Sequence, residues 1–165
     1  VKIIYNVEDR FLGTAGALKF AESFFKNESK FIMMNGDECK AVNFNALNNV
    51  FEKNRAVAAI ALVPIDYTGA GGIVRTDGER ITNFNEKPEG EQKGKKLINA
   101  GAYILSPRIF DYIPDGKVVS IEKDVFPKLA EEGKAFGIPC VSQFFQTDTF
   151  ERLEKAREGW QGYSK

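Results

Sequence analysis

Segments typical of strands and helices alternate along the first half of this chain of 165 residues. Short apolar runs at 2–5, 30–34 and 57–64 predict strands, and 15–25 and 44–53 predict the helices between them. In 15–25 the apolar residues recur at intervals of three and four, as on one buried helix face. Such alternation indicates βαβ units. We therefore expect an α/β fold with a Rossmann-like, mixed and mostly parallel sheet flanked by helices.

The second half of the chain predicts a hairpin and further elements of the same fold. Asp77-Gly78 separates two strands expected at 72–75 and 80–84, and an Asp-Gly pair is a strong signal for a tight hairpin turn. The other elements are expected to be a strand at 98–105, a helix at 121–132 capped by Ser120, and a helix at 149–160. Because no linker or repeat divides the sequence, we expect one domain over residues 1–165.

Composition limits the chemistry and the partners. The sequence has no histidine, which excludes Ser-His-Asp catalysis, Cys-His catalysis and a histidine general base. Its 23 basic side chains balance 23 acidic ones, so no overall field attracts a nucleic-acid polymer or an anionic membrane. Cys39 and Cys140 are expected to be free thiols in a reducing compartment. With no signal-like N-terminus and no apolar run near the roughly 20 residues that span a bilayer, we expect a cytoplasmic protein.

Two glycine-bearing segments follow predicted strands. Leu12-Gly-Thr-Ala-Gly16 precedes a helix, where free N–H groups can bind a base edge or a phosphate, although a tight turn explains the same residues. Asn35-Gly-Asp37 ends a buried strand, so Asp37 is expected at the sheet edge where α/β folds bind ligands. One carboxylate there suits Mg²⁺, while a turn or helix cap is the alternative. Glu38 is expected to face solvent.

Three further groups of polar residues could contact a ligand. Glu86-Lys87 precedes a proline, and the pair could bind sugar hydroxyls and a phosphate or form a solvated ion pair. The segment 99–103 places Asn99, Gly101 and Tyr103 on one strand as a wall for a polar ring, unless Gly101 only relieves crowding. Glu122 could bind a ligand or complement a helix dipole.

Taken in order, these motifs resemble those of the sugar-1-phosphate nucleotidyltransferase family, especially the mannose-1-phosphate and heptose-1-phosphate guanylyltransferases. The segments that carry the resemblance are Leu-Gly-Thr-Ala-Gly-Ala at 12–17, Asn-Gly-Asp at 35–37, Phe-Asn-Glu-Lys-Pro at 84–88, Ile-Asn-Ala-Gly-Ala-Tyr-Ile-Leu-Ser-Pro at 98–107 and Ser-Ile-Glu-Lys-Asp-Val-Phe-Pro at 120–127. The resemblance implies that a sugar 1-phosphate and a nucleoside triphosphate react to give a nucleotide sugar and pyrophosphate. Mg²⁺ is the implied cofactor.

The resemblance also implies roles for individual residues. The implied nucleotide-binding residues are Glu8, Gly13, Thr14, Ala15 and Gly16. The implied sugar-binding residues are Gly72, Glu86, Asn99, Gly101 and Glu122. Asp37 and Lys87 are implied as catalytic residues, with Asp37 holding the metal and Lys87 the sugar phosphate. No nucleic-acid polymer or membrane partner is expected.

Two departures from the family pattern qualify this prediction. The family's glycine-rich triphosphate-binding segment has no counterpart here, so we expect a domain that lacks its first βαβ portion and is inactive as this polypeptide. The open sheet edge would then favour aggregation or a homo-oligomer. Gln146 stands where the family places a second metal-binding aspartate, and Asp148 is the substitute candidate. A non-catalytic sugar-nucleotide-binding or regulatory subunit is therefore the alternative function, and a glycosyltransferase is a more distant one.

Overall fold

The computed structural model describes residues 1–67, 72–85 and 94–162. Its larger sheet has the strand order β1-β6-β3-β7-β5-β4, and β4 also pairs with β6. These strands are β1 (Phe31–Met34), β3 (Ala58–Tyr67), β4 (Ile73–Asp77), β5 (Arg80–Asn85), β6 (Gly94–Leu105) and β7 (Ala135–Pro139). A second sheet pairs β2 (Glu38–Val42) with β8 (Val141–Gln146). In the described ranges, none of the helices has the length and apolar character needed to cross a bilayer.

The expected mixed α/β sheet is confirmed. β1, β3, β4 and β7 run in one direction, and β5 and β6 run in the other. Among the described strands, β3 and β7 are the neighbours that pair in parallel, because β6 lies antiparallel between β1 and β3. The hairpin expected at Asp77-Gly78 joins β4 to β5, and Gly78 has φ +56°. β6 is a central strand because it pairs with β1, β3 and β4.

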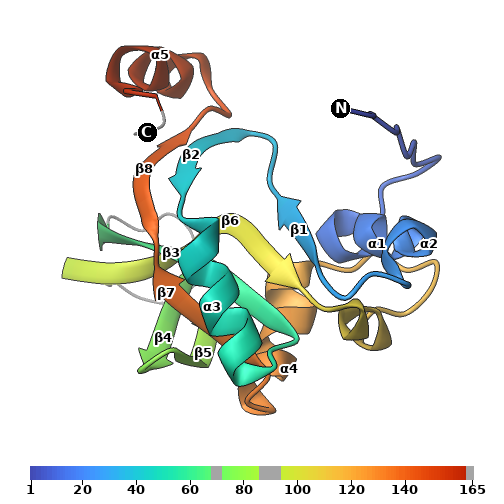
Figure 1. The fold of residues 1–165 in the computed structure, drawn as a ribbon. Helices are drawn as coiled ribbons and strands as arrows, with labels where there is room; N and C mark the ends of the chain where they lie inside the picture. Colours follow the sequence, from blue (N-terminus) through green and yellow to red (C-terminus); the bar gives the residue numbers. More distant parts are fainter. Residues whose placement is uncertain (68–71, 86–93, 163–165) are drawn as a thin grey trace.

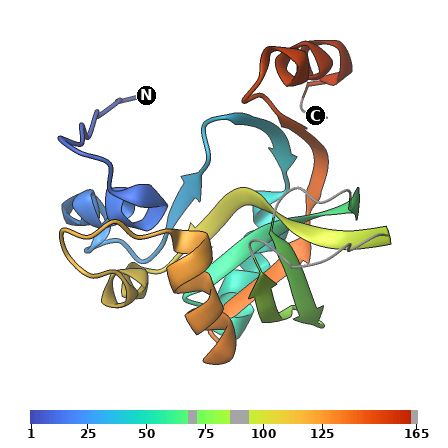
Figure 2. The same cartoon turned by 180° about the vertical axis from the view of Figure 1, so that it is seen from behind.

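Helices cover both faces of the sheet (Figures 1 and 2). One face packs against α3 (Phe44–Asn54), and the other packs against η2 (Ile121–Val125), a π-helix that continues into α4 (Phe126–Glu131). β3 supplies both cores because its side chains alternate. Ala58, Ile60 and Leu62 join the core beneath α4, while the odd-numbered neighbours join the core beneath α3.

The remaining helices lie beside the sheet rather than on its centre. They are α1 (Gly13–Phe20), α2 (Glu22–Phe25), η1 (Pro107–Tyr112) and α5 (Phe150–Gly159). The helix expected over 15–25 is divided at Ala21, whose N–H donates to the carbonyls of both Ala17 and Leu18. This shared bond tightens the turn and ends α1.

The strand expected at residues 2–5 does not form. Residues 1–8 have no regular secondary structure, and the side chains of Ile3, Ile4 and Tyr5 are exposed. A strand requires a neighbour for its backbone N–H and C=O groups, and no described strand pairs with this segment. Among the described strands, β1 lies at the end of the sheet next to β6, and its Ile32 and Met34 side chains are exposed.

Candidate active site

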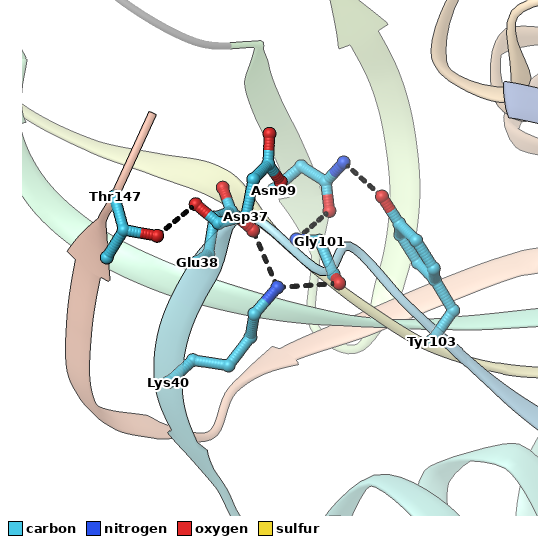
Figure 3. Close-up of polar contacts among 7 residues, drawn as sticks. All are labelled: Asp37, Glu38, Lys40, Asn99, Gly101, Tyr103 and Thr147. Atoms are coloured by element: carbon cyan, nitrogen blue, oxygen red, sulfur yellow. Dashed lines mark hydrogen bonds and ion pairs between the residues drawn. The ribbon is translucent and has the colours of Figure 1, made fainter. Parts of the chain in front are cut away.

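Polar side chains from three strands meet where β1 ends and the chain turns into β2 (Figure 3). β6 crosses this point and pairs with β1 through Met34 and Ala102. We call this group the strand-end cluster, and its members are Asn35, Asp37, Glu38, Lys40, Asn99 and Gly101. Motifs distant in the sequence are thus assembled by the pairing of β1 with β6.

Gly101 shapes the strand-end cluster through a bulge in β6. Opposite β3 the register passes from Tyr103 to Asn99 while β3 advances only from Ile60 to Leu62, so β6 carries the extra residues. Gly101 has φ +60°, a conformation that glycine adopts readily and other residues adopt at a cost. Bulges of this kind re-aim side chains and are frequent beside functional sites. The crowding explanation also holds, since a Cβ atom here would approach the Asn35 Nδ2 atom to 2.6 Å.

The bulge orients the Asn99 side chain. Its Oδ1 accepts a hydrogen bond from the Gly101 N–H at 3.0 Å, and its Nδ2 donates to the Tyr103 hydroxyl at 2.7 Å. The Asn99 N–H also reaches the carbonyl of Gly72 at 3.4 Å, which brings that buried glycine to the cluster. Because an amide has two N–H donors and an acceptor oxygen with two lone pairs, Asn99 retains capacity for further hydrogen bonds.

Asp37 lies at the exposed side of the cluster, as expected, with its backbone held by β8. Its carbonyl oxygen accepts hydrogen bonds from the Thr147 N–H at 3.0 Å and from the Thr147 hydroxyl at 2.8 Å. These bonds fix the backbone and leave the carboxylate to solvent, since the residue is exposed. The carboxylate is therefore available to a cation or ligand.

The prediction that Glu38 faces solvent is wrong. Its side chain is only 13% exposed, and its Oε2 accepts a hydrogen bond from Lys40 Nζ at 2.6 Å. Lys40 is buried and also donates to the Gly101 carbonyl at 2.8 Å. Burial raises the pKa of Glu38, and the charges of Asp37 and Asp148 act in the same direction, against the lowering effect of Lys40. A buried lysine needs such a partner because an unpaired buried charge is costly.

Gln146 and Asp148 lie on the β8 side of the cluster. Gln146 is directly opposite Glu38 in the β2–β8 ladder. Asp148 is exposed and accepts hydrogen bonds from Arg152 Nη1 at 2.8 and 2.9 Å, which lower its pKa. Over the described ranges, no group of three or more potential His, Cys, Asp or Glu ligands is close enough to form a metal centre. Any cation here would depend on one or two carboxylates and on oxygen atoms of a substrate.

A second group, which we call the helix-start cluster, joins the beginning of α1 to the beginning of η2. Its members are Glu8, Gly13, Thr14, Ala15, Gly16, Ser120 and Glu122. The hydroxyls of Thr14 and Ser120 donate to the same Glu122 oxygen, Oε2, at 2.8 and 2.9 Å. Thr14 also accepts a hydrogen bond from the Ile121 N–H at 2.8 Å. The segments implied for nucleotide and for sugar are therefore in direct contact.

The two glycines of the helix-start cluster permit close backbone packing. A Cβ atom on Gly13 would lie 2.6 Å from the Val119 carbonyl oxygen, and one on Gly16 would lie 2.8 Å from that of Lys117. The N–H groups of Ala15 and Gly16 donate to the Val119 carbonyl at 2.9 and 3.3 Å. These two donors, expected to be free for a ligand, are occupied by the protein itself.

The structure brings together most of the predicted site residues in these two clusters. Glu8 belongs to the second because its carboxylate accepts a hydrogen bond from the Leu12 N–H at 3.2 Å. Glu86 and Lys87 lie outside the described residues. Sequence reasoning missed Lys40 and Thr147. Lys40 could have been found, since Glu38 and Lys40 are opposite charges two residues apart and would share a face of any strand through them.

Comparison with known proteins identifies relatives of the whole described fold. The family model described as "Nucleotidyl transferase" matches residues 1–157. A mannose-1-phosphate guanyltransferase of Yarrowia lipolytica is 38% identical over 133 residues, covering 79% of this chain and 36% of that protein. A UTP–glucose-1-phosphate uridylyltransferase of a Synechocystis species is 34% identical over 130 residues, covering 76% of this chain and 33% of that protein. The chain thus spans about a third of the length of these curated relatives.

A solved structure has the same fold. HddC from Yersinia pseudotuberculosis has a TM-score of 0.74 and 28% sequence identity, with 93% of this chain and 65% of that chain covered. The same protein has also been crystallised in complex with GMP-PN.

Replacing Gly101 by alanine tests the bulge. Gly101→Ala should lower the free energy of unfolding by about 2–4 kcal/mol, because the left-handed φ costs about 1–2 kcal/mol and crowding against Glu38 and Asn35 adds the rest. Gly78→Ala is the matched control, since Gly78 also has a positive φ but open space around its Cβ position. It should cost only about 1–2 kcal/mol. Urea denaturation measures both, and equal losses would show that no crowding exists at Gly101.

Proposed function

Because the chain belongs to the nucleotidyl transferase family, whose model matches residues 1–157, we propose that its protein joins a sugar 1-phosphate to a nucleoside triphosphate. The products are a nucleotide sugar and pyrophosphate. The observation that carries the proposal is the strand-end cluster, which contains both the exposed Asp37 and the oriented amide of Asn99. The Asp37 carboxylate suits phosphate chemistry, and the Asn99 amide suits a sugar. Both belong to the cluster that forms where β6 passes the end of β1. The names of the relatives support mannose 1-phosphate and GTP as the first substrates to test.

The cluster fits Mg²⁺, and Asp37 is the residue that would hold it. Mg²⁺ usually keeps several waters and binds one or two carboxylates together with substrate phosphates. Asp37 offers one exposed carboxylate with a fixed backbone, while Asp148 is engaged by Arg152. When bound, the ion supplies positive charge that neutralises phosphate oxygens during transfer.

The residues of the chain act by binding and orienting. A phosphate oxygen of the sugar 1-phosphate forms the new bond to the α-phosphorus, and the bond to pyrophosphate breaks, so that pyrophosphate leaves with the electron pair. Such an in-line transfer depends mainly on alignment and charge stabilisation. The proposed sugar contacts are Asn99, Gly101, Gly72 and Glu122. Glu86 and Lys87 are proposed on the resemblance alone.

The helix-start cluster is proposed to contact the nucleotide. Glu8, Gly13 and Thr14 lie at or just before the beginning of α1, whereas Ala15 and Gly16 are buried and their N–H groups donate to Val119, so their proposed contribution is to hold the turn that presents Gly13 and Thr14. Glu122 receives both hydroxyls on Oε2, so its Oε1 receives none of these hydrogen bonds. That oxygen is the proposed acceptor for a sugar hydroxyl. The Thr14–Glu122 bond then holds the nucleotide side and the sugar side at a fixed separation.

Pyrophosphate release tests the proposed function. The purified protein is assayed with GTP and mannose 1-phosphate, then with the other common nucleoside triphosphates and sugar 1-phosphates, each with Mg²⁺. Asp37→Asn should lower turnover by about 100-fold or more, as expected for the loss of a preorganised charged group. Asp77→Asn, at an exposed strand end, is the matched control and should stay within about twofold.

Other outcomes separate this proposal from the non-catalytic alternative. Full turnover by Asp37→Asn would contradict the role of Asp37. A protein that binds a nucleotide sugar but releases no pyrophosphate would favour the binding or regulatory subunit, which Gln146 and the Asp148–Arg152 pair support. Gln146→Asp is then the variant to assay, because it supplies a carboxylate opposite Glu38.

A cytoplasmic location and self-association are further parts of this proposal. Both cysteines are free, which is usual in a reducing compartment. Ile32 and Met34 of β1 are 53% and 44% exposed, and such apolar side chains on an end strand favour pairing with another chain. Sedimentation of residues 1–165 should therefore show association, and a well-behaved monomer would contradict it.

A further inference from the structure

Lys40 is a buried lysine that belongs to none of the sequence motifs. Its side chain is 0% exposed, whereas lysines are almost never fully buried unless they are paired. Its ammonium group donates to Glu38 Oε2 at 2.6 Å and to the Gly101 carbonyl at 2.8 Å. One buried cation therefore joins β2 to the bulge of β6 (Figure 3).

The two groups that Lys40 joins adjoin the two halves of the proposed site. Glu38 directly follows Asp37, the residue proposed to hold the cation. The Gly101 peptide also accepts a hydrogen bond from the Asn35 N–H at 2.9 Å, and its own N–H donates to the Asn99 side chain at 3.0 Å. A displacement of Lys40 would therefore shift Asp37 through Glu38, and it would shift Asn99 through the Gly101 peptide.

The stability of the fold alone does not explain the buried ion pair between Glu38 and Lys40. A buried ion pair contributes little net stability compared with apolar side chains of similar volume, because both charges lose their hydration. Its value lies in fixed geometry, since the ammonium group must lie where both acceptors are within hydrogen-bond distance. Thr147, directly after β8, donates two hydrogen bonds to the Asp37 carbonyl. Asp37 is therefore held from the β8 side as well as from β2.

We propose that Lys40 is a positioning residue that sets the placement of Asp37 relative to Asn99, so that the metal-bound phosphate and the sugar of one substrate are aligned. This inference rests on the proposed function. Lys40 does not touch the substrate but acts through Glu38 and the Gly101 peptide. Both hydrogen bonds of Lys40 described above lie within the strand-end cluster, so nucleotide binding at the helix-start cluster should be largely independent of it.

The variant that tests this role is Glu38→Leu combined with Lys40→Met. The pair removes both charges together, so no unpaired buried charge remains to unfold the protein. Lys40→Met alone leaves Glu38 buried without its partner and is expected to lower stability. Lys30→Met is the control, because Lys30 is a partly buried lysine whose bonds to Glu52 and Asn48 lie outside the two clusters.

Kinetics separate positioning from packing. In the double variant, kcat/KM for the sugar 1-phosphate should fall by about 10- to 100-fold, since small misplacements have effects of that size. KM for the nucleoside triphosphate and the midpoint of urea denaturation should stay near those of the unmodified protein, as should all values for Lys30→Met. A folded double variant with unchanged kcat/KM would overturn the proposal.

Amide hydrogen exchange decides the proposal without turnover. Exchange at Asn35 and Gly101 should become about tenfold faster in the folded double variant, because the tether between β2 and β6 is lost. Exchange at Leu105, farther along β6, should not change. If the unmodified protein releases no pyrophosphate, the proposed function fails, but faster exchange still supports a positioning role of Lys40. Unchanged exchange at Asn35 and Gly101 overturns that role in either case.

Discussion

The left-handed backbone of Gly101 is the constraint on which the site depends. β6 is a central strand, paired with β1, β3 and β4, and regular pairing along it would place every residue on one face or the other. The bulge interrupts that alternation where β1 ends. It allows the β6 backbone to approach Glu38 and Asn35, and it turns one carbonyl toward Lys40. Without a residue that accepts φ +60°, the strand-end cluster could not form in this way.

Both clusters use polar groups to hold backbone segments together. In the strand-end cluster, the side chains of Lys40 and Asn99 each bond to the Gly101 backbone, and Thr147 bonds to the Asp37 carbonyl from the end of β8. At the helix-start cluster, Thr14 joins α1 to the first residue of η2, and the Val119 carbonyl joins α1 to the segment before η2. Buried or partly buried polar groups need partners, so each cluster is fixed by its own hydrogen bonds. These hydrogen bonds hold the groups of each cluster in place, which suits the proposed chemistry by alignment in a chain without histidine.

The sequence predicted elements whose signal is local and missed those that depend on distant contacts. The Asp77-Gly78 turn, the helix expected over 44–53 and the Ser120 cap were all predicted from neighbouring residues and are confirmed, the helix as α3. β7 and β8 were not predicted, because the glycine and proline of β7 and the polar residues of β8 weaken the local strand signal, and these segments become strands beside β3 and β2. The N-terminal run at 2–5 shows the converse, since its strand-like composition finds no partner in the described structure.

The candidate site shows the same division. Asp37 and Asn99 were predicted from motifs, and the structure places them in one cluster. The pairing of Glu38 with Lys40 could have been predicted from their spacing, but their burial could not, because it arises from the pairing of β2 with β8 and from the bulge of β6. A charged residue is expected at a surface unless a partner of opposite charge is brought to it. Here Lys40 is brought to Glu38 because both residues lie on the strand β2, which was not predicted.

A crystal structure of the protein with Mg²⁺ and a nucleotide sugar would test the central claim most directly. The account predicts that the cation contacts the Asp37 carboxylate and phosphate oxygens, that the sugar contacts Asn99, and that Glu38 stays on Lys40. A cation held by a Glu38 carboxylate that has left Lys40, or a nucleotide sugar bound away from the strand-end cluster, would contradict it.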